Sequence, residues 1–251
     1  MIYGAYGYSG ELVAEEAVRR GHRPVLAGRS EAKLAPLAAR LGLKSVTVDL
    51  DDAPGLARAV DGFDAVFHAA GPFSQTSDPM VRACLDVGAS YADITGEIPV
   101  FRNTLTYDAA ARERGIVLMS GVGFDVVPTD CLAAYVAGKL PGATQLSIAV
   151  AGLMQPSAGT AKSMFEGMLA GGFVRRDGEM VSVPFGKGGR DVRFWDRERK
   201  VLPMPWGDLE TAYWSTRIPN ITTYMAMPRN AAVAARVTWR LGAVTTPILR
   251  G

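Results

Sequence analysis

A glycine-rich segment near the N-terminus, Gly4-Ala5-Tyr6-Gly7-Tyr8-Ser9-Gly10, has the composition and the setting of a phosphate-binding loop. Its glycines follow the pattern G-x-x-G-x-x-G between a short apolar segment and a helical pattern. Glycines allow a tight turn and a close approach of the backbone to a pyrophosphate, and the N-terminus of the following helix favours negative charge. The loop therefore predicts a dinucleotide site formed by Gly4, Ala5, Gly7, Tyr8, Ser9 and Gly10, although a glycine turn without a ligand would have the same residues.

The second apolar segment ends in Gly28-Arg29-Ser30, and Lys33 follows one helical turn later. A site specific for NAD usually places an Asp or Glu here, where it binds the ribose 2′-hydroxyl, and this sequence has none. Arg29 can bind a 2′-phosphate with two N–H groups, Ser30 can donate its hydroxyl, and Lys33 adds a positive charge. These residues predict NADP rather than NAD, the alternative being that both cations are solvated surface charges.

Two further segments lie where parallel strands would end. Asp49 follows the third strand, where it would either meet the adenine or cap the next helix. Ala70, Gly71 and Pro72 follow the fourth strand, where small residues let the backbone pass close to the nicotinamide half of a cofactor. His68, within that strand, is expected to be a core histidine rather than a general acid.

Strands and helices alternate through the first 140 residues. Short apolar segments occur at residues 2–3, 24–28, 45–48, 65–68, 91–94 and 116–119. Helical patterns follow at residues 11–20, 30–42, 54–60, from Asp78-Pro79 onward, at 101–114 and after Pro128. This alternation predicts an α/β domain, a doubly wound parallel Rossmann sheet of six strands, over residues 1–140.

After Pro141-Gly142 the pattern changes to alternating segments, glycine turns and scattered aromatic residues. The change predicts an α+β domain with an antiparallel sheet over residues 141–251, interrupted by a helix at 160–169 and closed by one at 231–241. Gly159-Thr160-Ala161-Lys162 would give the first of these helices an N-terminus able to receive an anion. Aromatic side chains and one acid could line a substrate pocket or belong to the core or an interface: Trp206, Glu210, Tyr213, Trp214 and Tyr224.

Composition excludes several classes of protein. The formal net charge is +2, and the charges are scattered, so no basic stripe for nucleic acid is present. No apolar run is long enough to span a membrane, and no secretory leader is recognisable, which predicts a soluble cytoplasmic protein. Cys84 and Cys131 lie far apart in apolar helical patterns and are expected to be small core residues, and no metal site is predicted.

Three stretches together resemble the saccharopine dehydrogenase-like reductases, in particular the bacterial branch that includes the trans-acting enoyl reductases. They are Tyr3-Gly4-Ala5-Tyr6-Gly7-Tyr8-Ser9-Gly10, the run Ala69-Ala70-Gly71-Pro72-Phe73 with Tyr91-Ala92-Asp93-Ile94-Thr95-Gly96-Glu97, and Gly121-Val122-Gly123-Phe124-Asp125-Val126-Val127-Pro128-Thr129-Asp130. The resemblance implies an NADP-binding Rossmann domain followed by an α+β domain that supplies the substrate site. It also implies a further C-terminal segment, because such relatives usually continue beyond the equivalent of Gly251.

A reductase needs a group that protonates the product, and Tyr91, Asp93, Glu97 and Asp125 lie near the expected carboxyl edge of the sheet. Structural roles are equally open, because Asp125 and Asp130 could cap the helix after Pro128 and Glu97 could cap the helix that follows it.

The sequence therefore predicts an NADP-dependent oxidoreductase that transfers a hydride from NADPH to an unidentified small or lipid-linked enoyl, carbonyl or imine substrate. A dehydrogenase of an amino-acid conjugate is one alternative, which convergent basic groups for carboxylates would favour. A non-catalytic NADP-binding protein is the other, because no Tyr-x-x-x-Lys dyad lies near the expected site. An open antiparallel sheet also offers an edge for a homodimer.

Overall fold

The computed structural model describes residues 1–152, 172–184 and 187–226, and the chain divides into two compact units, Met1–Val127 and Pro128–Gly251. This division lies before the helix that the sequence assigned to the end of the first domain. The helices expected at 160–169 and 231–241 lie outside the described residues, as does the anion site expected at Gly159-Thr160-Ala161-Lys162.

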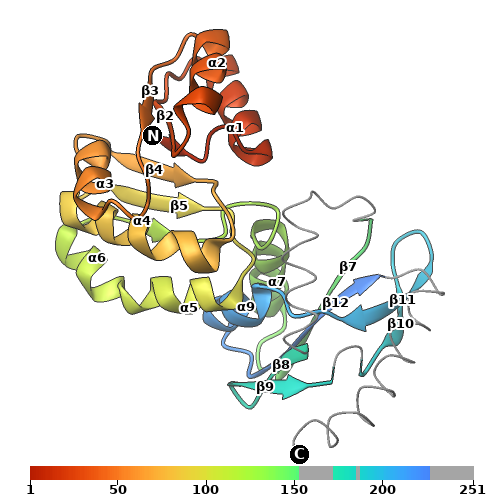
Figure 1. The fold of residues 1–251 in the computed structure, drawn as a ribbon. Helices are drawn as coiled ribbons and strands as arrows, with labels where there is room; N and C mark the ends of the chain where they lie inside the picture. Colours follow the sequence, from red (N-terminus) through yellow and green to blue (C-terminus); the bar gives the residue numbers. More distant parts are fainter. Residues whose placement is uncertain (153–171, 185–186, 227–251) are drawn as a thin grey trace, which may run out of the picture. The chain divides into compact units, whose positions relative to one another are not determined.

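The first unit is built on a six-stranded parallel sheet whose order is β3-β2-β1-β4-β5-β6 (Figure 1). This is the Rossmann order, and it confirms the predicted fold class. The strands are β1 (Ile2–Tyr3), β2 (Leu26–Gly28), β3 (Ser45–Thr47), β4 (Ala65–His68), β5 (Ser90–Asp93) and β6 (Leu118–Met119). The strand order changes direction at β1, because β2 and β3 lie on one side of it and β4 lies on the other. The carboxyl ends of β1 and β4 therefore form the switch point at which such sheets bind ligands.

Helices connect these strands, and they cover both faces of the sheet. They are α1 (Tyr8–Arg19), α2 (Glu31–Leu41), α3 (Ala53–Val60), α4 (Phe73–Val87), α5 (Ile98–Thr106) and α6 (Asp108–Arg114). Side chains of a strand alternate between the faces: Ile2 packs with α1 and α2, whereas Tyr3 packs with α3 and α4. Burial on both faces explains why β1 and β2 are continuous apolar runs rather than alternating ones.

The start of α4 differs from the prediction that Asp78-Pro79 would open the helix. The helix begins at Phe73, directly after Pro72, and Pro79 lies inside it. The carboxylate of Glu97, from the next connection of the sheet, accepts the N–H groups of Phe73 and Ser74. This long-range cap satisfies two of the N–H groups that every helix start leaves without an intrahelical partner, so the helix can begin earlier than its local cap signal indicates.

Residues 101–114, predicted as one helix, form the end of α5 and the whole of α6, with a break at Tyr107. The Tyr107 hydroxyl donates to Asp78 Oδ1 on α4 at 2.6 Å, and Asn103 Nδ2 donates to the same oxygen at 2.8 Å. Asp78 therefore joins α4 to the connection between α5 and α6 instead of capping its own helix.

The second unit holds the six-stranded sheet that the alternating segments predicted. Five strands run antiparallel in the order β10-β11-β12-β8-β9, and β7 pairs with β12 in parallel, which the sequence did not indicate. The elements are α7 (Val127–Lys139), β7 (Gln145–Val150), β8 (Gly172–Arg176), β9 (Glu179–Val183), β10 (Arg190–Arg193), β11 (Glu198–Pro203), α9 (Asp208–Thr216) and β12 (Asn220–Ala226).

Helix α9 packs on one face of this sheet through a buried arginine. Arg175 on β8 donates to the carbonyl of Leu209 (2.7 Å) and to the carboxylate of Glu210 (2.7 Å), and its guanidinium lies 4.2 Å from the ring centre of Tyr213. A buried cation requires such partners because its desolvation is otherwise costly. Tyr213 and Trp214, considered as residues of the antiparallel sheet, belong instead to α9.

The two cysteines differ in environment. Cys84 is buried in α4, as predicted, whereas Cys131 on α7 is exposed, so its assignment to the core is wrong. The apolar pattern of α7 misled the prediction, because this helix also exposes Leu132, Tyr135 and Val136.

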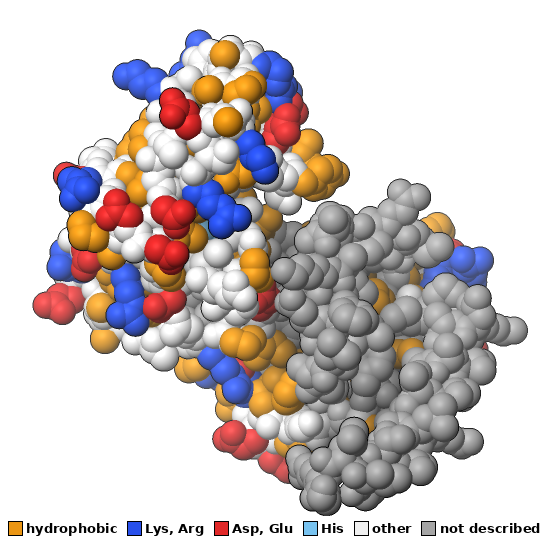
Figure 2. Space-filling model, viewed as in Figure 1, with side chains coloured by type: hydrophobic (Ala, Val, Ile, Leu, Met, Phe, Trp, Pro, Cys, Tyr) orange, Lys and Arg blue, Asp and Glu red, His pale blue; other side chains and the backbone are white. Residues whose placement is uncertain are grey.

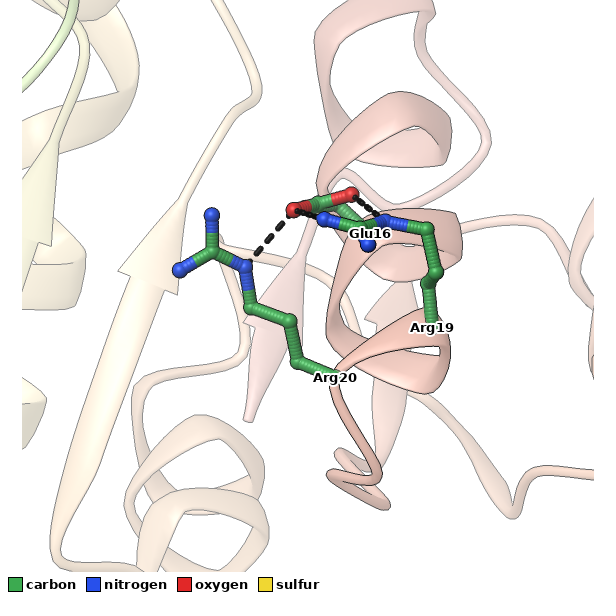
Figure 3. Close-up of polar contacts among 3 residues, drawn as sticks. All are labelled: Glu16, Arg19 and Arg20. Carbon is green, nitrogen blue, oxygen red and sulfur yellow. Dashed lines mark hydrogen bonds and ion pairs between the residues drawn. The ribbon is translucent and has the colours of Figure 1, made fainter.

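The surface carries interspersed charges rather than a field of one sign. On the face drawn in Figure 2, basic and acidic side chains alternate over the described part of the chain. Glu16 on α1 is typical, since it accepts hydrogen bonds from Arg19 (2.6 Å) and Arg20 (2.6 Å), as Figure 3 shows. Exposed pairs of this kind add little stability.

Within the described residues, we find no helix with the length and apolar character required to cross a bilayer.

A buried carboxyl group in the second unit predicts an unusual dependence of stability on pH. Burial raises the pKa of Asp208 from 3.8 to about 6, and the nearby Asp130 carboxylate adds to the shift. The folded state therefore favours protonated Asp208, and this contribution is present below pH 3.8 and is lost as the pH rises to about 6. We expect Asp208→Asn to unfold with a free energy about 3 kcal/mol higher than wild type at neutral pH, measured by urea denaturation.

The same comparison at pH 4 should show a much smaller difference between Asp208→Asn and wild type. Asp191→Asn, which changes an exposed carboxylate of the same unit, is the matched control and should show no such pH dependence. Equal stability of Asp208→Asn and wild type at neutral pH would contradict the assignment.

Candidate functional site

The glycine loop after β1 passes extremely close to the end of β4. Gly4 has φ +77°, and a Cβ built on it would lie 2.8 Å from both the nitrogen and the Cβ of Ala70. A Cβ on Gly10 would lie 2.3 Å from the carbonyl oxygen of Gly4. Only glycine fits at either position, so the first and third glycines of the motif hold the loop against β4 and α1 against the loop.

Helix α1 begins within this loop, at Tyr8. Its first helical hydrogen bond runs from Glu11 N–H to the Gly7 carbonyl at 2.9 Å, which leaves the N–H groups of Tyr8, Ser9 and Gly10 outside the helical ladder. Gly7, the N-cap residue, brings no side-chain acceptor to them. Three N–H groups and the positive end of the helix dipole therefore meet at one point, which is an arrangement that binds phosphate.

A cluster of cationic and aromatic groups surrounds the end of β2. The Tyr6 ring lies directly on Gly28, because a Cβ there would be 2.7 Å from Tyr6 Cε1, and Lys33 Nζ lies 5.6 Å from the centre of that ring. Arg29 is exposed next to them, and Ser30 is the N-cap residue of α2 without a side-chain capping bond. Arg29, Ser30 and Lys33 thus lie at the end of β2 and the start of α2.

Asp49 lies beyond β3 and is exposed, and its Oδ1 accepts the N–H of Asp51 at 3.1 Å. The helix cap that was considered for it is supplied by Asp52, whose carboxylate accepts from Gly55 N–H at 3.0 Å. Because Asp52 caps α3, Asp49 is not needed for that role and can meet another partner at the edge of the sheet.

Ala70, Gly71 and Pro72 form the connection between β4 and α4, and the Gly71–Pro72 peptide bond is cis. Thr76 Oγ1 lies 2.5 Å from the Ala70 carbonyl and 3.0 Å from the Pro72 carbonyl, and His68 Nε2 lies 3.1 Å from the same hydroxyl. Because the hydroxyl proton goes to a carbonyl, His68 Nε2 is the donor toward Thr76. His68 is fully buried, which lowers its pKa to about 3, so it is the neutral core histidine that was predicted.

Asp93, at the end of β5, organises the neighbouring loops. Its carboxylate accepts from the Tyr91 hydroxyl (2.7 Å), from the N–H groups of Thr95 (2.9 Å) and Gly121 (2.8 Å), and from the Ser120 hydroxyl (3.0 Å). Burial raises the pKa of both the Tyr91 phenol and the Asp93 carboxyl group. This network ties the loop after β5 to the loop after β6.

Glu97 continues the network toward α4. Its N–H donates to Thr95 Oγ1 at 3.0 Å, and its carboxylate accepts from Phe73 and Ser74 at 2.9 Å each. Glu97 is also the N-cap residue of α5 but makes no side-chain capping bond there, so the cap considered for the following helix serves α4 instead.

Asp125 reaches the same region from the loop after β6. A Cβ on Gly96 would lie 2.0 Å from Asp125 Oδ2, which places this carboxylate beside the segment that carries Glu97. Asp130 lies in the first turn of α7 and accepts from Ser215 on α9 at 2.9 Å, within the second unit. Among the four predicted catalytic residues, Tyr91 and Asp93 are buried, whereas Glu97 and Asp125 are partly exposed.

The pocket residues considered in the second unit do not form one wall. Glu210 pairs with Arg175, and Tyr213 stacks on the same guanidinium. Trp214 is exposed, and its ring lies against the guanidinium of Arg217. The ring of Tyr224, on β12, lies against the guanidinium of Arg190, on β10.

Sequence reasoning missed two residues of the site, Tyr6 and Thr76. In the glycine motif Tyr6 occupies a variable position, so the motif assigns it no role. The glycine at the end of β2 was the available signal, because a residue without a side chain there leaves room for a large ring. Thr76 carries no such signal. Its hydroxyl binds the Ala70 and Pro72 carbonyls, and this depends on how the connection between β4 and α4 folds back over the helix.

Comparison with known proteins agrees with this geometry. A sequence model for the family described as NAD(P)H-binding matches residues 4–136, which is more than half of the chain. The chain belongs to this family. Its matched region contains the glycine loop and every candidate residue of the first unit.

Two curated relatives are similar to part of the chain. The chain is 33% identical over 138 residues to the trans-acting enoyl reductase of Mycobacterium tuberculosis (strain H37Rv), covering 52% of this chain and 33% of that protein. It is 28% identical over 163 residues to the saccharopine dehydrogenase-like oxidoreductase of Bos taurus, covering 57% of this chain and 38% of that protein. The chain thus spans 33% of the first relative's length and 38% of the second's.

The fold of the whole chain is similar to that of the saccharopine dehydrogenase (L-Glu forming) of Saccharomyces cerevisiae. The TM-score is 0.68 with 14% identity, over 92% of this chain and 55% of that one. At this identity the likeness concerns the fold alone, and it includes both units.

The Asp93 network predicts a specific cost for removing its charge. In Asp93→Asn, an amide NH₂ group would replace one acceptor oxygen and face donors, leaving buried groups unsatisfied. We expect the free energy of unfolding to fall by about 2 kcal/mol in urea denaturation. Asp86→Asn, an exposed position in α4, is the control and should change stability little; an unchanged stability of Asp93→Asn would show that the network is not formed.

Proposed function

We propose that this protein is an NADP-dependent oxidoreductase of the saccharopine dehydrogenase-like kind, which reduces an unidentified small or lipid-linked substrate. The observation that carries the proposal is the cradle formed by the glycine loop. Gly4 and Gly10 bring three N–H groups of α1 that lie outside the helical ladder to the switch point of the sheet, and the chain belongs to an NAD(P)H-binding family.

The residues present fit the cofactor. Gly4, Ala5, Gly7, Tyr8, Ser9 and Gly10 would hold the pyrophosphate, and Ala70, Gly71 and Pro72 would border the nicotinamide. Asp49 would meet the adenine.

The choice of NADP over NAD rests on the end of β2. Arg29, Ser30 and Lys33 lie together there, and no acid occupies the position that usually binds the ribose 2′-hydroxyl. A 2′-phosphate at this place would gain charge-assisted hydrogen bonds that a hydroxyl cannot form.

NADPH bound in this cradle supplies a hydride. Of the four candidate residues for the chemical step, Asp93 holds the loops, Tyr91 is hydrogen-bonded to it below the surface, and Glu97 caps α4. Asp125 lies at the same edge of the sheet, with its carboxylate against Gly96. We propose that the group that positions or protonates the reduced substrate is among these four residues.

The substrate itself belongs to the proposal. The relatives' names, enoyl reductase and saccharopine dehydrogenase-like oxidoreductase, support reduction of an enoyl, carbonyl or imine group. We assign cofactor binding to the domain of residues 1–140 and substrate binding, with any homodimer contact, to residues 141–251; cytoplasmic location is part of the same proposal.

The test is a parallel titration of wild type and Arg29→Ala with NADPH and NADH, followed by nicotinamide fluorescence. We expect wild type to prefer NADPH, and Arg29→Ala to bind NADPH about tenfold more weakly with little change for NADH, because only the 2′-phosphate contact is lost. Arg58→Ala, which removes an exposed arginine of α3, is the matched control and should behave as wild type.

Two outcomes would contradict the proposal. Equal affinity for both cofactors would overturn the assignment to NADP. Failure to bind either cofactor would overturn the assignment of the protein as an oxidoreductase.

A further inference from the structure

A hollow of about 330 Å³ lies on the sheet of the second unit, and two of the residues that line it are arginines, Arg176 and Arg190. It is formed by strands β7, β8, β10 and β12. The helix α9 packs on the other face of this sheet, since Arg175, which binds α9, pairs in register with Ile221 of β12. Arg176 and Thr222, the next residues of these strands, therefore point to the opposite face.

Both guanidinium groups are held in place over β12. Arg176 Nη1 donates to Thr222 Oγ1 at 3.3 Å and to the carbonyl of Arg175 at 3.2 Å. The Arg190 guanidinium lies 4.7 Å from the ring centre of Tyr224. Thr222 and Tyr224 are two residues apart on one strand, so their side chains lie on the same face, and both arginines therefore reach the same face of β12.

The positive charge of this pair has no carboxylate partner within the residues that the structure describes. The ion pairs of the same sheet join other residues, namely Arg175 with Glu210, Arg199 with Asp196 and Lys200 with Asp191. Glu179 lies opposite Arg176 across β8 and β9 but forms no ion pair with it. Between residues 153 and 171, 185 and 186, and 227 and 251, the sequence holds a single acidic side chain, Glu166.

Neutral hydrogen-bonding groups complete the hollow. The side chains of Gln145, Ser147 and Asn220 line it with the two arginines. Asn220 is fixed by donating to the Thr144 carbonyl at 2.9 Å and accepting the N–H of Asp177 at 3.1 Å. Paired guanidinium groups beside an amide and a hydroxyl provide several donors, a set that suits a carboxylate or a phosphate.

We propose that this hollow is a binding site for the oxyanion group, carboxylate or phosphate, of a small organic molecule, held between Arg176 and Arg190. That this molecule is the substrate rests on the proposed function, and it would then be an anionic compound rather than a purely apolar one. Such a substrate agrees with the convergent basic groups expected of a dehydrogenase of an amino-acid conjugate.

Calorimetric titration of the full chain with glutarate and with inorganic phosphate tests the site. We expect saturable binding of at least one of these probes, about tenfold weaker in Arg176→Gln and in Arg190→Gln, because each variant removes charge-assisted hydrogen bonds. Preferential binding of glutarate would identify a carboxylate ligand, and preferential binding of phosphate a phosphorylated one. Neutral glutaramide should not bind.

The matched control is Arg193→Gln, which removes an exposed arginine of β10 that does not line the hollow. It should bind the probes as wild type does, and the thermal unfolding midpoint of each variant verifies its fold. No saturable binding to wild type, or an equal loss in Arg193→Gln, would overturn the site. If the probes bind but NADPH does not, the proposed function fails and the anion site remains.

Discussion

The fold of the first unit depends on one steric constraint, the close approach of the glycine loop to the end of β4. At Gly4 the backbone of one strand connection touches the backbone of another, and at Gly10 the first helix touches the loop. Any Cβ at these positions would separate β1, β4 and α1. Because the N-terminus of α1 is fixed by the same contacts, the geometry that closes the fold also creates the phosphate-binding point.

A second constraint fixes the opposite half of the carboxyl edge. Asp93 accepts four hydrogen bonds from the ends of β5 and β6, and Glu97 carries the connection on to the start of α4. Buried carboxylates are tolerated when their oxygens are satisfied in this way. The carboxyl edge therefore consists of loops with defined positions, and Asp125 lies in one of them.

The second unit uses arginine differently on the two faces of its sheet. Arg175 is neutralised by Glu210 and covered by Tyr213, which joins β8 to α9, whereas Arg176, its neighbour in sequence, lies on the other face without a carboxylate partner among the described residues. The alternation of a strand thus gives two adjacent arginines different roles, one structural and one available for a ligand.

The sequence by itself determined the sheet order, the glycine loop and the cluster at Arg29, because these follow from the alternation of elements and from residues close together along the chain. Only the tertiary structure decided where α4 begins, what Glu97 caps, and that Tyr6 packs on Gly28, since each depends on contacts between separate connections. The break at Tyr107 and the parallel pairing of β7 with β12 are of the same kind. Local patterns record the preferences of single elements, whereas these features arise from partners that the folded sheet brings together.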